Sequence, residues 1–204
     1  MIRSDRSVFW KAQLRQWHWI SSAICLAGLL LFAVTGFTLN HAGWIEATPQ
    51  TISRDIHLSP ALHARLGKAA DGQPLAAGLA EALETETGIS VADRPVEMRD
   101  NELYLDLPGP GVDSYISVDM ASGTATYERT SRGVIAVLND LHKGRNAGPA
   151  WGLFIDVIAA ACAIFSLTGL GLLWVHARGR PATWPLTSLG FVLPVILFIL
   201  FVHS

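Results

Sequence analysis

Three long apolar segments stand out along the chain, and each is a candidate to cross a bilayer as a helix. A spanning helix needs about 20 mostly apolar residues. Residues 17–39 and 151–175 meet this requirement, and residues 186–202 form a shorter third segment that contains Pro194. All seven tryptophans lie near the ends of these segments, as in an interfacial aromatic belt. The pattern therefore predicts three transmembrane helices.

The first apolar segment has a rival interpretation as a cleaved signal peptide. Its apolar run of about 20 residues is longer than the usual hydrophobic region of a signal peptide, and no clear A-x-A cleavage site follows it. We therefore expect the segment to be retained as a membrane anchor.

The stretch 43–145 is more polar and is long enough for one small domain. Apolar residues spaced three and four apart predict a helix over 75–86 that stops at Gly88. The remaining predicted elements are a strand within 96–107, a turn at 108–111, a strand, turn and strand over 114–127, and a helix over 133–141. The order of helix, strands and helix predicts a small α+β domain between the first two spans.

The distribution of charge predicts the orientation of the chain, because lysine and arginine favour the cytoplasmic side of a membrane. Residues 1–16 hold four basic residues and one acid, and residues 176–185 hold two arginines and no acid. Residues 43–145 hold nine basic and fifteen acidic residues, a difference of −6. We expect residues 1–16 and 176–185 to be cytoplasmic and the domain at 43–145 to be periplasmic, in a bacterial inner membrane.

Composition supports a membrane protein and excludes several other classes. Half of the residues are hydrophobic, only 16% are charged, and the mean hydropathy is +0.35. A net charge of −2 provides no overall basic field for nucleic acid. Two cysteines cannot make a disulfide framework or a zinc site, and neither G-x-S-x-G nor H-E-x-x-H occurs.

Several short motifs occur together in the order expected of one membrane protein family. The first span begins with QWHWISS and ends in TGFTLNH, the domain contains SYISVDMASGTATY, and LNDLHKGR precedes a second span that ends in SLTGLGLLW. Over roughly residues 14–178 the chain resembles the PepSY-associated transmembrane helix family of bacterial inner-membrane proteins. The resemblance implies a PepSY-like domain at 43–145 and a haem-containing electron-transfer protein, and some members of the family reduce ferric siderophores.

Five histidines lie at predicted membrane boundaries, which independently suggests a haem. His41 and His142 belong to the periplasmic face, and His18 and His176 belong to the cytoplasmic face. Two histidines from different helices at one depth can ligate a b-type haem iron, and the absence of C-x-x-C-H excludes covalent attachment. His18 and His41 are about 35 Å apart along a straight helix, so they cannot share one iron. One or two haem groups are therefore possible.

Of the two pairs, we favour His41 and His142 as ligands of the haem iron, because both lie in motifs that match the family. His18 also matches the histidine at the head of the first span, and His176 matches less well. The alternative for each is an ordinary interfacial side chain. His57, His63 and the terminal His203 are expected to be surface residues.

Other polar residues near these histidines are candidates for supporting roles. Asp156 lies roughly 8 Å into the second span, where a carboxylate is costly and should face protein, on one helix face with Gly152, Ala160 and Ala163. It would orient a ligating histidine or relay a proton, or else bond to Asn40, Thr38 or Thr35 or pair with Arg145. Lys143 and Arg145 would bind haem propionates or lipid headgroups.

The favoured hypothesis is an electron-transfer protein that passes electrons through haem b to a periplasmic acceptor, such as a ferric chelate or a flavoprotein. A ferric-reductase-like oxidoreductase subunit is one form of it, with a partner redox subunit or a homodimer completing the site. A non-enzymatic, membrane-anchored PepSY module is the first alternative, because PepSY domains resemble inhibitory segments of secreted peptidases. A protein that handles haem or a metal reversibly is the second.

Overall fold

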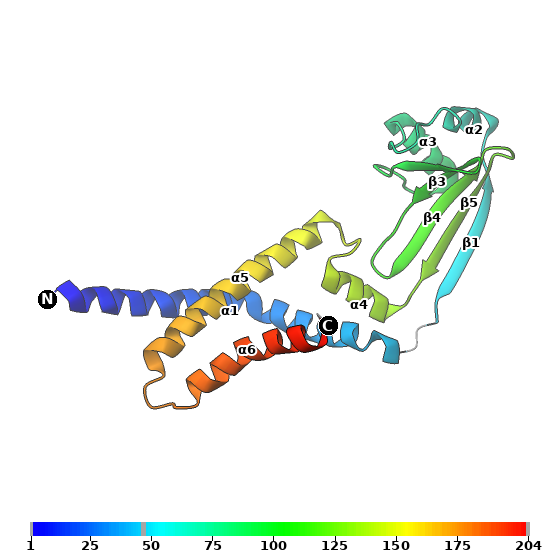
Figure 1. Cartoon of the computed structure of the whole chain (residues 1–204). Coiled ribbons are helices and arrows are strands. Elements are labelled where there is room, and N and C mark those ends of the chain that lie inside the picture. The colour runs from blue at the N-terminus through cyan, green and yellow to red at the C-terminus, as the bar shows by residue number, and fades with distance from the viewer. Residues whose placement is uncertain (1, 46–47, 203–204) are drawn as a thin grey trace. The chain divides into compact units, whose positions relative to one another are not determined.

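The computed structural model describes residues 2–45 and 48–202 and divides the chain into two compact units. One unit contains the chain up to Leu31 and from Phe154 onward, and the other contains Phe32–Leu153. The long helices α1 (Ile2–Asn40) and α5 (Gly148–His176) contribute to both units (Figure 1). Each unit is described by itself below.

Three helices within the described residues are long and apolar enough to cross a membrane: α1, α5 and α6 (Thr183–Phe201). The three predicted spans are thus confirmed as apolar helices. Helix α1 begins at Ile2 rather than at Trp17, because good helix formers such as Lys11, Gln13 and Leu14 continue the helix beyond its apolar part. The sequence pattern located the apolar part only.

In the first unit, small residues allow α1 and α5 to cross closely. A Cβ atom added at Gly28 would lie 2.7 Å from the side chain of Ile158, so only glycine fits there. Gly171 lies in the same way against Leu14. Helix α6 differs, because none of its described side chains is buried, which suits a helix that faces lipid.

The second unit contains a five-stranded antiparallel sheet with the strand order β1-β5-β4-β3-β2. Its strands are β1 (Gln50–His57), β2 (Val96–Arg99), β3 (Glu102–Asp106), β4 (Val112–Asp119) and β5 (Thr124–Ser131). A short 3₁₀ helix, η1 (Ala42–Trp44), precedes the sheet in the chain. Strands β3 and β4 alternate buried and more exposed residues, so each has one face in the core.

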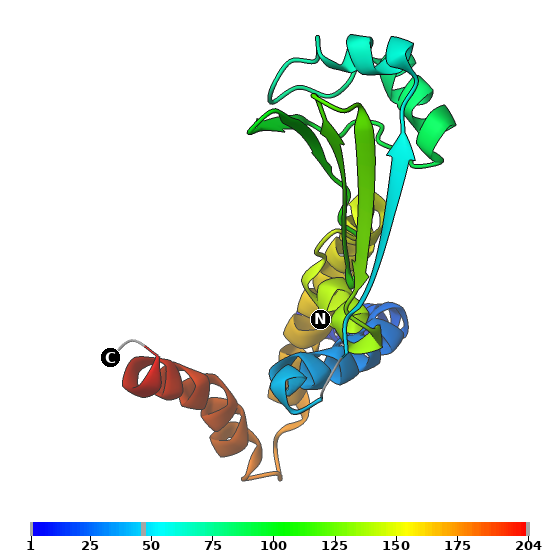
Figure 2. The ribbon, with the colours of Figure 1, turned by 90° about the vertical axis from the view of Figure 1, so that its right-hand side faces the viewer.

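Two helices cover one face of this sheet and complete the domain core. Helices α2 (Pro60–Leu66) and α3 (Ala77–Thr87) lie at one end of the sheet, and α4 (Val134–Lys143) lies at the other (Figure 2). The fully buried core side chains are leucine, isoleucine and valine from α2, α3 and the strands: Leu66, Leu83, Val91, Val96, Leu103, Leu105, Ile116 and Val118. The expected small α+β domain is confirmed as a helix-covered sheet.

The predicted order of elements within the domain is wrong at its beginning. The structure adds β1 and α2 before the first predicted helix. Strand β1 gives a weak sequence signal, because it is an exposed edge strand in which Ile56 alone is partly buried. Helix α2 had a readable signal in the N-cap Ser59, the following Pro60, and leucines four residues apart at 62 and 66.

The strand predicted within 96–107 is in fact the hairpin β2–β3. Asp100 and Asn101 both have positive φ, 44° and 71°, and connect Arg99 to Glu102 in a two-residue turn. This conformation is typical of a type I′ hairpin turn, which asparagine and aspartate tolerate better than other non-glycine residues. The helix stop at Gly88 is confirmed, with φ of 73°.

The predicted turn at 108–111 joins β3 to β4 and receives helix α4. Gly111 has a φ of 67°, and a Cβ atom there would lie 2.4 Å from the side chain of Val137 and 2.7 Å from its backbone nitrogen. The turn therefore needs glycine at 111 for two reasons, the backbone conformation and the close approach of α4.

We expect Gly111→Ala to lower the free energy of unfolding by about 1–3 kcal/mol, through backbone strain and the clash with Val137. Denaturant unfolding of the full chain in detergent, followed by circular dichroism, measures this loss. Gly109→Ala is the matched control in the same turn, because a Cβ atom at 109 meets only an ordinary contact with Val112 at 3.9 Å. Equal stability of the two variants would contradict the prediction.

Candidate functional site

His18 of α1 is held against α5 by hydrogen bonds at Nδ1 and by stacking of its ring. Its Nδ1 lies 3.2 Å from the carbonyl oxygen of Phe165 and 3.1 Å from the Thr168 hydroxyl. The ring also stacks on Phe165, with centroids 4.6 Å apart and planes 17° from parallel. The His18 ring is thus fixed in position and in orientation.

The hydrogen bonds around His18 also determine which ring nitrogen carries the proton. A carbonyl oxygen can only accept, and the Thr168 hydroxyl already donates to the carbonyl of Ile164 at 2.7 Å. Nδ1 of the neutral ring must therefore be the donor. The Nε2 lone pair remains, and no partner for it occurs within the described residues. An imidazole in this tautomer is prepared to ligate iron through Nε2.

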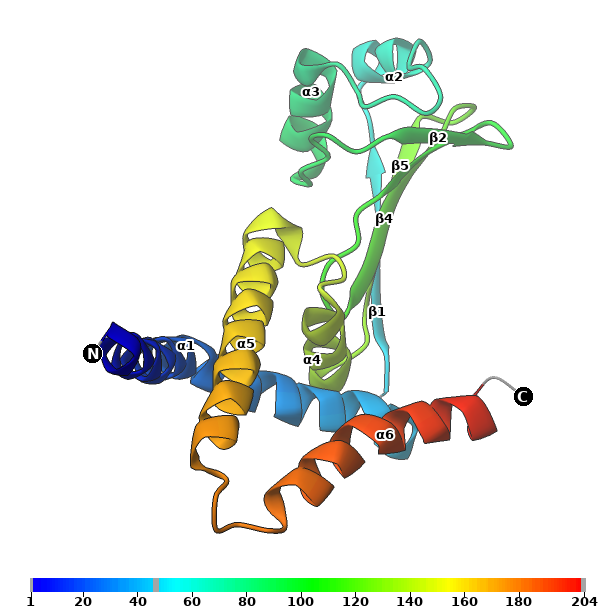
Figure 3. The ribbon, with the colours of Figure 1, turned by 60° about the vertical axis from the view of Figure 1, so that its left-hand side comes forward.

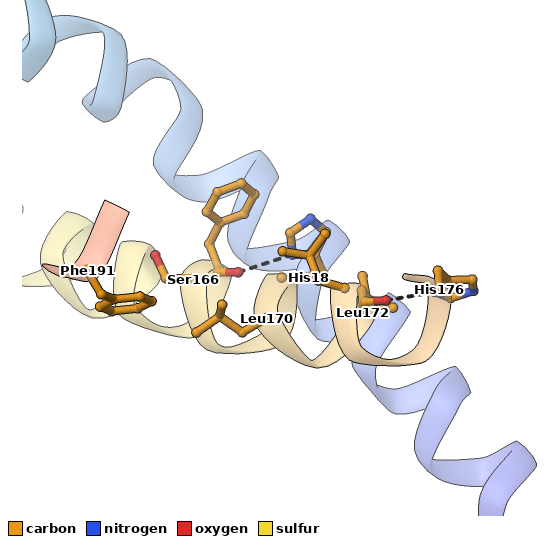
Figure 4. A pocket seen from close by; sticks show the side chains of 9 residues that line it. His18, Ser166, Leu170, Leu172, His176 and Phe191 are labelled. Atoms are coloured by element: carbon orange, nitrogen blue, oxygen red, sulfur yellow. Dashed lines mark hydrogen bonds between the residues drawn. The ribbon is translucent and has the colours of Figure 1, made fainter. Parts of the chain in front are cut away.

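His18 and His176 line the same apolar cavity, which has a volume of about 540 Å³ (Figure 4). His176 Nδ1 donates to the carbonyl oxygen of Leu172 at 2.9 Å, so in the neutral ring the lone pair is again on Nε2. Most of the remaining wall is apolar and comes from α5 and α6: Phe165, Leu170, Leu172, Leu173 and Phe191. The cavity brings His18 and His176, two of the predicted haem ligands, to one site.

His142 of α4 is held on α1 in the second unit by a similar arrangement. Its Nδ1 lies 2.8 Å from the Thr35 hydroxyl, and Phe32 contacts its ring edge-on at 5.3 Å. A Cβ atom added at Gly36 would lie 3.2 Å from His142 Cε1, just as one at Gly169 would lie 3.4 Å from His18 Cε1. In both units a Thr-Gly dipeptide of an apolar helix supports one histidine.

Four consecutive residues of α4 bond to three different parts of the second unit. The Thr38 hydroxyl donates to Asn139, and Trp151 Nε1 donates to the carbonyl of Leu141 at 2.8 Å. The buried Asp140 carboxylate accepts the Gly111 N–H and an Arg132 N–H, each at 2.8 Å. Helix α4, and with it His142, is therefore fixed to the sheet, to α1 and to α5 (Figure 3).

The structure does not bring His41 and His142 together, although the sequence favoured them as a pair. His41 Nδ1 bonds to the carbonyl of Phe37 in its own helix at 2.9 Å, and its ring lies between Phe37 and Trp44. His41 follows Gly36, which supports His142, by five residues, or about 140° around a helix. The two rings therefore lie on different sides of this end of α1.

Asp156 does not face protein, so that expectation is wrong for the single chain. It is exposed, and within the described residues it has no hydrogen bond or ion pair. The buried residues of α5 are Ile158, Ala161 and Thr168, and they form the face that contacts α1. Asp156 lies on the opposite side of the helix, so it does not reach this contact. Threonine hydroxyls, rather than this carboxylate, orient His18 and His142.

The other predicted residues make fewer contacts. Asn40, Lys143 and Arg145 are exposed, and none of their side chains bonds to a described residue. His57 is exposed and lies 3.2 Å from the Thr124 hydroxyl, and His63 Nε2 lies 3.2 Å from the Met120 carbonyl. His203 lies outside the described residues. Among the residues described, no cluster of three or more His, Cys, Asp or Glu is placed to hold a metal ion.

Sequence reasoning missed Thr168, and it named Thr35 only as a possible partner of Asp156, not as a support for a histidine. A signal was present, since both spans that contact a histidine contain Thr-Gly. The glycine of each dipeptide permits close packing, and the group packed against it is an imidazole.

The fold and these sites define a membrane protein with three apolar helices and one small PepSY-like sheet domain. The family described as "Putative PepSY_TM-like" matches residues 9–203. The chain therefore belongs to this family, which confirms the resemblance to PepSY-associated transmembrane proteins. Comparisons with curated proteins and with solved structures give no match.

We expect Asp140→Asn to destabilise the sheet domain by about 1–3 kcal/mol, because a buried carboxylate loses its charge-assisted bonds to Gly111 and Arg132. Asp113→Asn is the matched control, since Asp113 contacts the same Arg132 at 2.9 Å from an exposed position. The control should change stability by about 0.5 kcal/mol or less. Urea unfolding of each full-length variant tests this, and equal losses would show that burial of Asp140 is unimportant.

Proposed function

We propose that this protein binds a b-type haem at His18 and transfers electrons in the membrane. The observation that carries the proposal is the fixed His18 imidazole, with its Nε2 lone pair unused, in an apolar cavity that it shares with His176. This site differs from the His41 and His142 pair that the sequence favoured.

The residues around the cavity suit a haem in three respects. Its volume of about 540 Å³ is within the range of about 300–1,000 Å³ found for cofactor sites. Its wall is apolar apart from the two histidines and Ser166, as burial of a porphyrin requires. Imidazole is a common axial ligand of haem iron, and two are present.

In this proposal each residue has a definite task. The Phe165 carbonyl and the Thr168 hydroxyl hold the proton on His18 Nδ1, which keeps Nε2 available and more basic. Gly169 leaves space for the ring, and the leucines and Phe191 exclude water. A haem bound there would supply one-electron Fe(III)/Fe(II) chemistry. His142, supported in the same manner, is the candidate ligand for a second haem.

The charge distribution supports an inner-membrane location with the sheet domain in the periplasm. Electrons would come from a quinol, a cytoplasmic flavin reductase or a partner redox subunit. They would pass to a periplasmic acceptor, such as a ferric chelate or a flavoprotein. The family membership supports the membrane setting, and the site supports the haem.

A reduced-minus-oxidised absorption spectrum of the purified full chain, with haem per chain quantified, tests the proposal. We expect a low-spin b-type spectrum in the wild type and its loss in His18→Ala. Thr168→Val should retain the haem but bind it about tenfold more weakly, because His18 loses a hydrogen bond that orients it.

His57→Ala is the control, since His57 is an exposed histidine of the sheet domain and should leave the spectrum unchanged. A folded wild type that stays colourless after haem is supplied during expression would overturn the proposal. A spectrum that is lost in His142→Ala but kept in His18→Ala would assign the haem to the second unit instead.

A partner-binding PepSY module is the second candidate function, favoured by the face of the sheet opposite α2 and α3. Tyr104 and Tyr115 stack there with centroids 4.8 Å apart, and the Arg99 guanidinium lies 4.6 Å from the Tyr104 centroid. Partial burial raises the pKa of both tyrosines, so their hydroxyls remain neutral at ordinary pH. Such aromatic groups are frequent anchors at protein interfaces.

For this second function, a photo-crosslinking residue at Ser117, on the same face as the tyrosines, should capture one specific protein in cells. The same residue at Glu81, exposed on α3, is the control and should capture none. Loss of the adduct in a Tyr104→Ser, Tyr115→Ser double variant would support the module, and an adduct that persists would exclude this face.

A further inference from the structure

A second cavity, separate from the histidine site, lies where α5 and α6 are joined. It has a volume of about 290 Å³ and is lined by Trp174, Ala177, Arg178 and Trp184. The two indoles contact edge to face at 5.6 Å, and the connection between them is short. Gly179, with a φ of 98°, and hydrogen bonds from Ala177 to Leu173 and from Arg180 to Ala177 hold the turn.

The residues that line this cavity carry three polar side-chain groups, and all three are donors. They are the Arg178 guanidinium and the N–H groups of the two indoles, and none of the three is hydrogen-bonded or ion-paired within the described residues. None of the four lining residues carries a carboxylate. A site with donors, a positive charge and no acceptor side chain is complementary to an anion.

The position of the cavity indicates the source of the anion. Trp174 is in the last turns of α5 and Trp184 is in the first turn of α6. The cavity therefore lies where the C-terminal end of α5 meets the N-terminal end of α6, and both helices are long and apolar enough to cross a membrane. Tryptophan and arginine at this level of a membrane contact lipid headgroups. The exposed apolar surfaces of α5 and α6 would contact the acyl chains of the same lipid.

We propose that this cavity binds the headgroup phosphate of an anionic glycerophospholipid. Arg178 pairs with the phosphate oxygens, and the indole N–H groups of Trp174 and Trp184 donate to the headgroup. The site goes beyond the haem proposal and does not depend on it, because it shares no lining residue with the histidine cavity.

Native mass spectrometry of the delipidated full chain, titrated with phosphatidylglycerol or phosphatidylcholine in neutral detergent, tests the site. We expect one phosphatidylglycerol to bind more tightly than the rest, and phosphatidylcholine to show no such preference. Arg178→Gln should weaken this first binding step about tenfold, the effect of losing a charge-assisted hydrogen bond. Trp184→Phe should weaken it less, because it removes one donor and keeps an aromatic ring.

Arg180→Gln is the matched control, because it also removes one arginine charge. Arg180 is two residues from Arg178, and its side chain does not line the cavity. It should retain the wild-type affinity within about twofold, since exposed charges outside a site contribute little. Equal losses in the two arginine variants would overturn the site and leave only general attraction to anionic lipid. Displacement of the bound lipid by inorganic phosphate alone would overturn the lipid as the ligand.

Discussion

The buried carboxylate of Asp140 is the group on which the arrangement of the second unit depends. It joins helix α4 to the sheet through Gly111 and Arg132, while its neighbours Asn139, Leu141 and His142 join the same helix to α1 and α5. A charge removed from water is stable only when it is paired and hydrogen-bonded, so this position tolerates little change. The last turns of α4 thereby fix an imidazole and one end of the sheet together.

The two supported histidines show how a helix interior can prepare a ligand without a carboxylate. Each imidazole places Nδ1 on a threonine hydroxyl and its ring over the adjacent glycine. In an apolar helix a threonine hydroxyl donates its proton to a backbone carbonyl of the same helix, and its oxygen still accepts from an imidazole N–H. This arrangement has a lower desolvation cost than a buried aspartate. This is a physical reason why Thr168 and Thr35, and not Asp156, contact the two imidazoles in the single chain.

Sequence patterns located the features that depend on local chemistry. Hydropathy found the three long helices, and glycine marked the end of α3 and the turn before β4. What could not be predicted depends on contacts distant in the chain. Strand β1 is recognisable only through its pairing with β5, and the separation of His41 from His142 depends on which side of α1 receives α4. The histidines were identified from their positions at the membrane boundaries, whereas the hydrogen-bonding role of each ring nitrogen could be assigned only from the structure.

Helices α1 and α6 are both apolar, but they are constrained differently. At Gly28 the space beside Ile158 admits no larger side chain, so shape decides which residue is acceptable. Helix α6 has no buried side chain among its described residues, so hydropathy, and not shape, limits which residues are acceptable there. Over evolutionary time α6 should therefore exchange leucine, isoleucine, valine and phenylalanine freely. The crossing of α1 and α5 should drift slowly, and sequence divergence within one membrane domain would be uneven for that reason alone.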